Sequence, residues 1–255
     1  MEQAIKSAHR VTKRITNTPC PDFTGEVVIV KVGQAATPVV VHEALLLKSS
    51  EHMRAVLSYR WMAAPASNVK TATLIDSEVE TFNACVRYIY SGYIYTCPPK
   101  PQASDLADMT NPPVHRGGEH MEWRTLINLY LLGEYLIDTG FVNAVVDAMI
   151  DKWRADRLYP VGYVAQVYNA TAKGSPLRKL LVDCHVHLGL GKEIKHGGVD
   201  ANEGTLEFMI DVNEEWASAG AASWEKDAAE PWDNDPCRYH VHDQKVPKTA
   251  CQTGI

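Results

Sequence analysis

Between positions 25 and 96 the apolar residues alternate between strand-like and helix-like spacing. The β-branched run at residues 27–32 predicts a strand buried on both faces. Apolar residues at 39–41 predict a second strand, and the alternation over 69–75 predicts a third that is half exposed. A fourth strand is expected at residues 93–96.

Helices are predicted between these strands. Residues 44–58 are typical of a compact helical pair, with Ser49 or Ser50 as the N-cap of its second helix. Ser77 followed by Glu80 is a capping-box pattern and predicts the start of another helix. Gly92 is expected to end that helix, because glycine readily adopts the left-handed backbone of a C-cap.

Helical spacing continues through the second half of the chain. Residues 121–137 and 141–153 predict two amphipathic helices, and three more are expected at 160–172, 175–190 and 202–219. The fold class expected from this order is α+β, a small mixed sheet with a helical cluster, followed by a short all-helical C-terminal extension.

The pattern divides the chain into four segments. Residues 1–21 are predicted to be a disordered leader, and residues 22–157 the main domain, with a proline- and glycine-rich insertion at 97–120. A helical extension is expected at 158–224, and an acidic tail with cysteine and histidine at 225–255, its first part extended.

Four motifs follow one another in the main domain: Val27, Val28, Val30, Val32 and Gly33, then Val41, His42, Leu45 and Leu46, then Ser50, Met53 and Leu57, and finally Phe82, Tyr88, Ile89, Tyr90, Ser91 and Gly92. In type and order these motifs resemble those of the BTB/POZ domain in its fungal form. The resemblance covers the chain from about Phe23 to Trp153. It departs from the family pattern at Glu26, where aspartate is usual, at Val39, where an aromatic residue is common, and at Met53, which takes the place of phenylalanine.

The resemblance implies the BTB/POZ fold and a non-enzymatic role in protein–protein association, including homodimerisation. The implied dimer surface consists of Val27, Val28, Ile29, Leu45, Leu46, Leu47, His52 and Met53. The alternative is that these residues form the core, which we expect for Val28 and Leu46. Because the leader contains no clear extra strand, a weak dimer or a monomer is also compatible with the sequence.

A second role implied by the resemblance is that of substrate adaptor for a cullin ubiquitin ligase. The implied docking residues are Met53, Tyr59, Trp61, Tyr130 and Tyr135. Fungal members often contain W-x-E after the second helix, whereas this chain has Trp61-Met62-Ala63. The missing glutamate removes one charge-assisted contact, of the kind that contributes about 1.5–3 kcal/mol. An alternative is a transcription-linked BTB regulator, although no zinc-finger array or strongly basic domain follows.

Composition restricts the partners and the cellular compartment that we expect for this protein. A net charge of −6 disfavours nucleic acid as a partner, and no apolar run is long enough for a membrane span or a signal peptide. Six cysteines without a secretory start indicate reduced thiols. We therefore expect a protein of the cytoplasm, the nucleus or both, without a cofactor, and the resemblance implies protein partners. Enzyme signatures such as G-x-S-x-G and the phosphate-binding loop are absent from the sequence.

One segment near the C-terminus has residues suited to metal chemistry. Cys237, His240 and His242 supply a thiolate and two imidazoles, which are zinc ligands. Cys184, His185 and His187 are candidates to complete a tetrahedral set, but the adjacent Cys184 and His185 would point about 100° apart on a helix. The chain has no C-x-x-C spacing, and tails similar to P-W-x-x-x-P-C-x-Y-H-x-H end many fungal BTB proteins. We expect packing or tail docking here, with metal binding as the alternative.

Overall fold

The structure is a computed structural model. It describes residues 23–63, 70–96, 117–156, 160–188, 203–219, 230–235 and 237–242. The predicted leader at 1–21 and most of the predicted insertion at 97–120 lie outside these residues. The fold class is α+β: a small mixed sheet and several helices, which confirms the coarse prediction.

The sheet has three strands among the described residues, β1 (Val27–Val32), β2 (Thr37–His42) and β3 (Lys70–Leu74). Its order is β2-β1-β3, with β1 antiparallel to β2 and parallel to β3. The hairpin turn between β1 and β2 begins at Gly33, whose φ of 71° is left-handed and favours glycine.

Only one face of the sheet is buried. Val28, Val30 and Val32 are fully buried, whereas Lys31 between them is exposed. The prediction that β1 is buried on both faces was therefore wrong, because helices cover one side only of this strand. In β3, Ala72 and Leu74 are buried, whereas Thr71 before them and Thr73 between them are more exposed. The predicted half-exposed strand with alternating faces is therefore confirmed.

Three helices follow and surround the buried face: α1 (Glu43–Ser49), α2 (Glu51–Ala63) and α3 (Val79–Ser91). The predicted cap at Ser50 is confirmed, since the Met53 backbone N–H donates to Ser50 Oγ over 3.0 Å. Ser50 Oγ also donates to the Leu136 carbonyl over 2.7 Å, which fixes the α1–α2 junction against the last residue of the later helix α4 (Gly117–Leu136).

Two local predictions in this region were wrong, while a third was correct. The cap of α3 is Glu78 and makes no side-chain hydrogen bond, so the capping box of Ser77 and Glu80 does not form. The described residues 93–96 contain no strand. Gly92 does end α3, with a φ of 73° and its N–H donating to the Tyr88 carbonyl over 2.7 Å.

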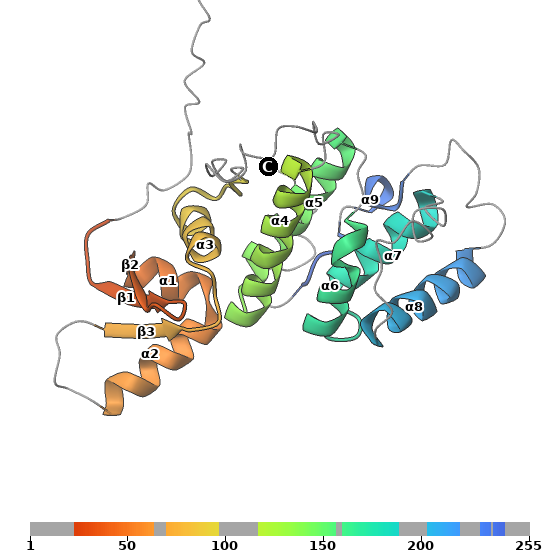
Figure 1. The fold of residues 1–255 in the computed structure, drawn as a ribbon. Helices are drawn as coiled ribbons and strands as arrows, with labels where there is room; N and C mark the ends of the chain where they lie inside the picture. The colour runs from red at the N-terminus through yellow and green to blue at the C-terminus, as the bar shows by residue number, and fades with distance from the viewer. Residues whose placement is uncertain are drawn as a thin grey trace, which may run out of the picture.

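A helical hairpin, α4 (Gly117–Leu136) and α5 (Thr139–Asp156), forms the middle of the molecule (Figure 1). Because α4 already begins at Gly117, the predicted insertion ends earlier than expected. Gly133 allows close packing of the two helices, since a Cβ at this position would lie 2.8 Å from Val142 Cγ2. Asp138 caps α5 by accepting from the Phe141 N–H over 3.0 Å.

The remaining elements form the other end of the molecule (Figure 1). A 3₁₀ turn, η1 (Val161–Tyr163), precedes α6 (Val164–Ala170), α7 (Pro176–Leu188), α8 (Glu203–Ala219) and the short α9 (Pro231–Asn234). The three predicted tail helices are thus confirmed, and Pro176 is the first residue of α7, where proline is well tolerated. The short helix α9 corrects the expectation that the acidic segment is extended.

Candidate functional site

The predicted dimer residues separate into two groups. Val28, Leu46 and Met53 have no exposed surface and lie in the hydrophobic core. They are therefore not surface residues of the folded chain, and the interpretation of Val28 and Leu46 as core is the correct one. The reason is their position. Val28 lies on the face of β1 that the helices cover, and Leu46 of α1 and Met53 of α2 are buried in the same core. The other five are partly exposed, namely Val27, Ile29, Leu45, Leu47 and His52.

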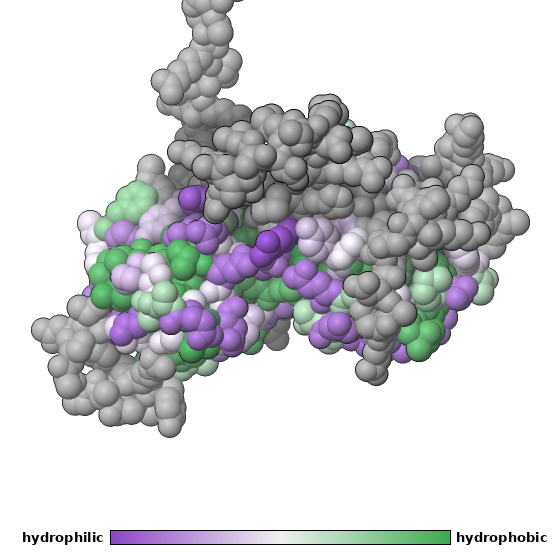
Figure 2. All heavy atoms as spheres, in the orientation of Figure 1, coloured by the Kyte–Doolittle hydropathy of each residue, from purple (hydrophilic) through white to green (hydrophobic). Residues whose placement is uncertain are grey.

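The outer face of the sheet is apolar where β1 meets β2. Ile29 is the register partner of Val40, and directly opposite residues share a face of an antiparallel pair. The Val40 side chain is 57% exposed, and Val27 lies on the same face of β1. Figure 2 shows hydrophobic side chains gathered at this end of the molecule beside hydrophilic ones. We call Val27, Ile29 and Val40 the outer sheet patch.

Two residues of the family-like motifs meet next to this patch. The Tyr90 hydroxyl lies 2.6 Å from His42 Nδ1 and accepts from the His42 N–H over 3.0 Å. Phe23 stacks on Tyr90 with ring centroids 5.7 Å apart. The partner of the His42 ring is thus a side chain from α3. The contact fixes the end of β2 against that helix.

The predicted cullin-docking residues are likewise divided. Met53 and Tyr130 are fully buried, and the Tyr130 hydroxyl lies 2.9 Å from Ser175 Oγ, so neither belongs to a surface. Tyr135 is 55% exposed, and its ring centroid lies 4.6 Å from that of His52. Tyr59 and Trp61 belong to α2, but their side chains lie outside the described part of the structure.

A concave site of about 330 Å³ lies between α1, α3 and the α4–α5 turn, and its lining includes Leu45, Ser49, Tyr88 and Asp138. Burial raises the pKa of Asp138 above its ordinary value and that of Tyr88 to about 12. The Asp138 carboxylate is engaged structurally, because it caps α5 and accepts from the Ser49 hydroxyl. The Ser49 hydroxyl and the Asp138 carboxylate are thus the hydrogen-bonded polar pair of this lining, and the cap on α5 gives the carboxylate a structural role.

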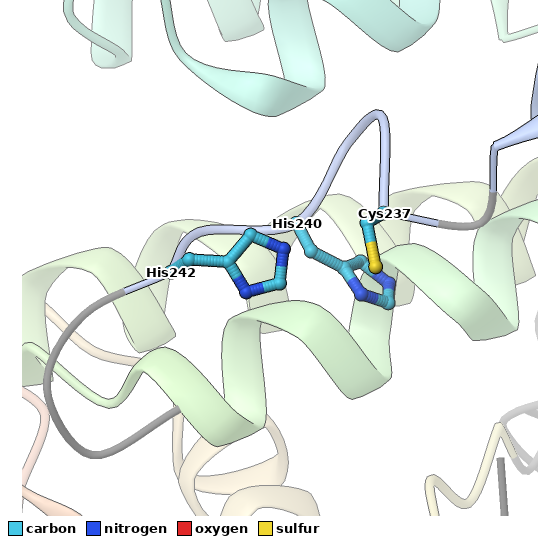
Figure 3. Close-up of side chains that lie close together, drawn as sticks. All are labelled: Cys237, His240 and His242. Carbon is cyan, nitrogen blue, oxygen red and sulfur yellow. The ribbon is translucent and has the colours of Figure 1, made fainter. Parts of the chain in front are cut away.

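The three predicted metal ligands lie together. One ligating atom from each of Cys237, His240 and His242 lies within 4.8 Å of the others. Figure 3 shows the His242 ring directed toward His240, with the Cys237 thiol beside the His240 ring. The cysteine is buried, the two histidines are partly buried, and His240 Nε2 lies 2.9 Å from Asp147 Oδ1 on α5.

The backbone that contains these ligands is held on two sides. Val241 forms a pair of hydrogen bonds with the Asn143 amide on α5, at 2.9 and 2.8 Å. On the other side, Asp183 of α7 accepts from Arg238 Nε over 2.7 Å and from the Tyr239 hydroxyl over 2.6 Å. Asp183 and Tyr239 are fully buried. The tail segment 237–242 is therefore docked between α5 and α7, as the packing interpretation predicted.

The additional pair on α7 takes no part in this arrangement. Cys184 and His185 are both buried, and the His185 ring packs against Phe208 of α8 with centroids 5.4 Å apart. Desolvation lowers the pKa of His185 and raises that of Cys184. Among the described residues, the grouping of metal-ligating atoms consists of Cys237, His240 and His242 alone.

Sequence reasoning missed the residues that position the tail. Asn143, Asp147 and Asp183 are ordinary polar residues of predicted helices, and the His240–Asp147 contact joins positions 93 residues apart. No local motif links them to the tail. The only available signal was the helical spacing itself, which places Asn143 and Asp147 one turn apart on the same face of α5.

In comparisons with known proteins, no protein-family model matches this chain, and no curated protein matches it with significant similarity. Among the described helices, none is both long and apolar enough to cross a membrane.

Proposed function

We propose that this protein is a non-enzymatic protein–protein interaction module of the BTB/POZ type, and that its first partner is a second copy of itself. The observation that supports the proposal is the arrangement of the residues that resemble the family. They come from separate parts of the chain, yet Val30, Leu46, Met53 and Phe82 share one core and His42 meets Tyr90.

The association surface in this proposal is the outer sheet patch. Val27, Ile29 and Val40 are apolar residues on the uncovered face of the sheet, beside the exposed ring of Phe23. Apolar residues exposed together on one face favour association, because contact removes their surface from water. The buried residues Val28, Leu46 and Met53 act indirectly, by holding the sheet against α1 and α2.

Sedimentation velocity at micromolar concentration tests the dimer. We expect the chain to dimerise and Val40→Lys to weaken dimerisation at least about tenfold, because the lysine would be buried without a partner in the interface. The matched control is Leu206→Lys on α8, where the side chain is 63% exposed and remote from the sheet. A chain that stays monomeric throughout the range would contradict the dimer.

The proposal extends to a cullin scaffold as a second partner. The surface would consist of the C-terminal part of α2, with Tyr59 and Trp61, together with Tyr135, whose exposed ring contacts His52. Affinity of the purified chain for a cullin N-terminal domain tests this step. We expect Ala63→Glu to strengthen binding by restoring the acidic residue of the family pattern. Equal affinity of the chain and this variant would count against α2 as the docking element.

A further inference from the structure

We propose that Cys237, His240 and His242 bind one divalent zinc-class ion, with Asp147 as a positioning residue for His240. The donor set is the first argument. A thiolate and two imidazoles are the ligands that zinc takes in tetrahedral sites, and harder ions such as magnesium and calcium prefer oxygen. The chemistry of these three side chains therefore selects a zinc-class ion.

The geometry is the second argument. Bond lengths of about 2.3 Å to sulfur and about 2.0 Å to nitrogen place tetrahedral ligand atoms roughly 3.3–3.6 Å apart. The three ligating atoms already lie within 4.8 Å of one another. A contraction of no more than about 1.5 Å between these atoms would bring them to the separations of a bound ion.

The surroundings of the ligands are the third argument. Metal-binding histidines commonly donate their second ring N–H to a carboxylate, which fixes the orientation of the ring. Asp147 Oδ1 lies 2.9 Å from His240 Nε2, and in this role it would leave Nδ1 to bind the ion. Hydrogen bonds of the two residues that flank His240, from Val241 to Asn143 and from Tyr239 to Asp183, hold the segment in place before any ion binds.

The three protein ligands leave one position for water or for a group from another molecule. Because the ligands belong to the tail segment 237–242 and the positioning carboxylate belongs to α5, an ion here would strengthen the attachment of this segment to α5. The expected consequence is greater stability of the docked tail, since an ion that binds only the folded chain stabilises it.

The test uses the full chain without a polyhistidine tag. Mass spectrometry of elements should find one zinc per chain, and Co²⁺ titrated into the chelated protein should give a thiolate charge-transfer band. Zinc at about 100 times its dissociation constant should raise the melting temperature on the order of 5 °C. Less than a tenth of an equivalent of zinc, with no cobalt band, would overturn the proposal.

Variants separate this site from adventitious binding. Cys237→Ser should abolish the cobalt–thiolate band, and Asp147→Asn should weaken metal affinity about 10–100-fold with the band retained. The controls are Cys85→Ser, a buried thiol of the core, and His52→Asn, a partly exposed imidazole on α2; both should bind cobalt as the unaltered chain does. Circular dichroism of each chelated variant verifies folding. A band that survives in folded Cys237→Ser would place the ion at another thiol.

Discussion

In the sheet end of the molecule, residues 23–96, the described buried polar residues are Ser50 and Thr81, and the rest of the core is apolar. In the helical end, residues 160–242, the buried polar or charged residues among those that the structure describes are Thr171, Ser175, Arg178, Asp183 and His185. The first region is stabilised mainly by non-directional apolar packing. The second depends on directional contacts between specific partners.

Arg178 illustrates how the helical end is held. Its guanidinium donates to Thr171 Oγ1 over 3.0 Å and to Glu207 over 2.7 Å, and it lies 4.4 Å from the centre of the Tyr168 ring. One side chain thus joins α6, α7 and α8. Apolar cores tolerate replacements of similar volume, whereas a buried charge without its partner is strongly unfavourable. The two ends should therefore respond differently to conservative substitutions.

The largest effect is expected at Asp183. Asp183→Ala should lower the free energy of unfolding by about 3–5 kcal/mol, because Arg238 and the buried Tyr239 hydroxyl lose their shared acceptor. Asp183→Asn should recover little of this loss, since the amide has a similar shape but no charge. Urea denaturation measures both. The control is Asp151→Ala, which removes an exposed ion pair and should have little effect. Full recovery by Asp183→Asn would show that shape matters more than charge here.

A loss of about 2–5 kcal/mol is expected for Leu46→Ala, because the truncation leaves a cavity at a fully buried position of the sheet end. Leu46→Met should cost less than about 1.5 kcal/mol, since it preserves volume and polarity. The same denaturation experiment checks both variants. If Leu46→Met were as damaging as Asp183→Asn, the contrast between the two ends would not hold.

The smallest effect is a dependence on pH in the helical end. Burial against Phe208 lowers the pKa of His185 below its ordinary value of 6.5, so the unfolded chain binds this proton more readily than the folded chain. The contribution of His185 to stability is therefore complete above pH 6.5 and declines as pH falls below it, by up to about 1.4 kcal/mol per unit, until the folded pKa is reached.

The free energy of unfolding, measured by urea denaturation from pH 7 to pH 5.5 with a chelator present, tests this dependence. His185→Gln lacks the titrating ring and should show a shallower decline of stability than the unaltered chain. The matched control is His52→Asn, a partly exposed residue, which should leave the slope unchanged. Parallel slopes for the chain and His185→Gln would rule out His185 as the source.

Local pattern was a good guide to the elements and a poor guide to their faces and ends. Residue spacing and local backbone preferences were enough to predict the three strands and the two helices on either side of Ser50. They were also enough to predict that α3 ends at Gly92. The capping box at Ser77 failed because Glu78, one residue later, takes the cap position of α3. Burial of β1 on one face only was missed because a run of valines is compatible with either environment.

By itself, the sequence determined the class of fold, the order of its elements and the candidate residues Cys237, His240 and His242, because side-chain type and spacing are local properties. Only the tertiary structure decided which of the predicted surface residues are core, as for Met53 and Tyr130, and which distant groups meet the tail, as for Asp147 and Asp183. The physical reason is that burial and partner choice depend on how helices pack across the whole chain, and no short stretch of residues specifies that packing.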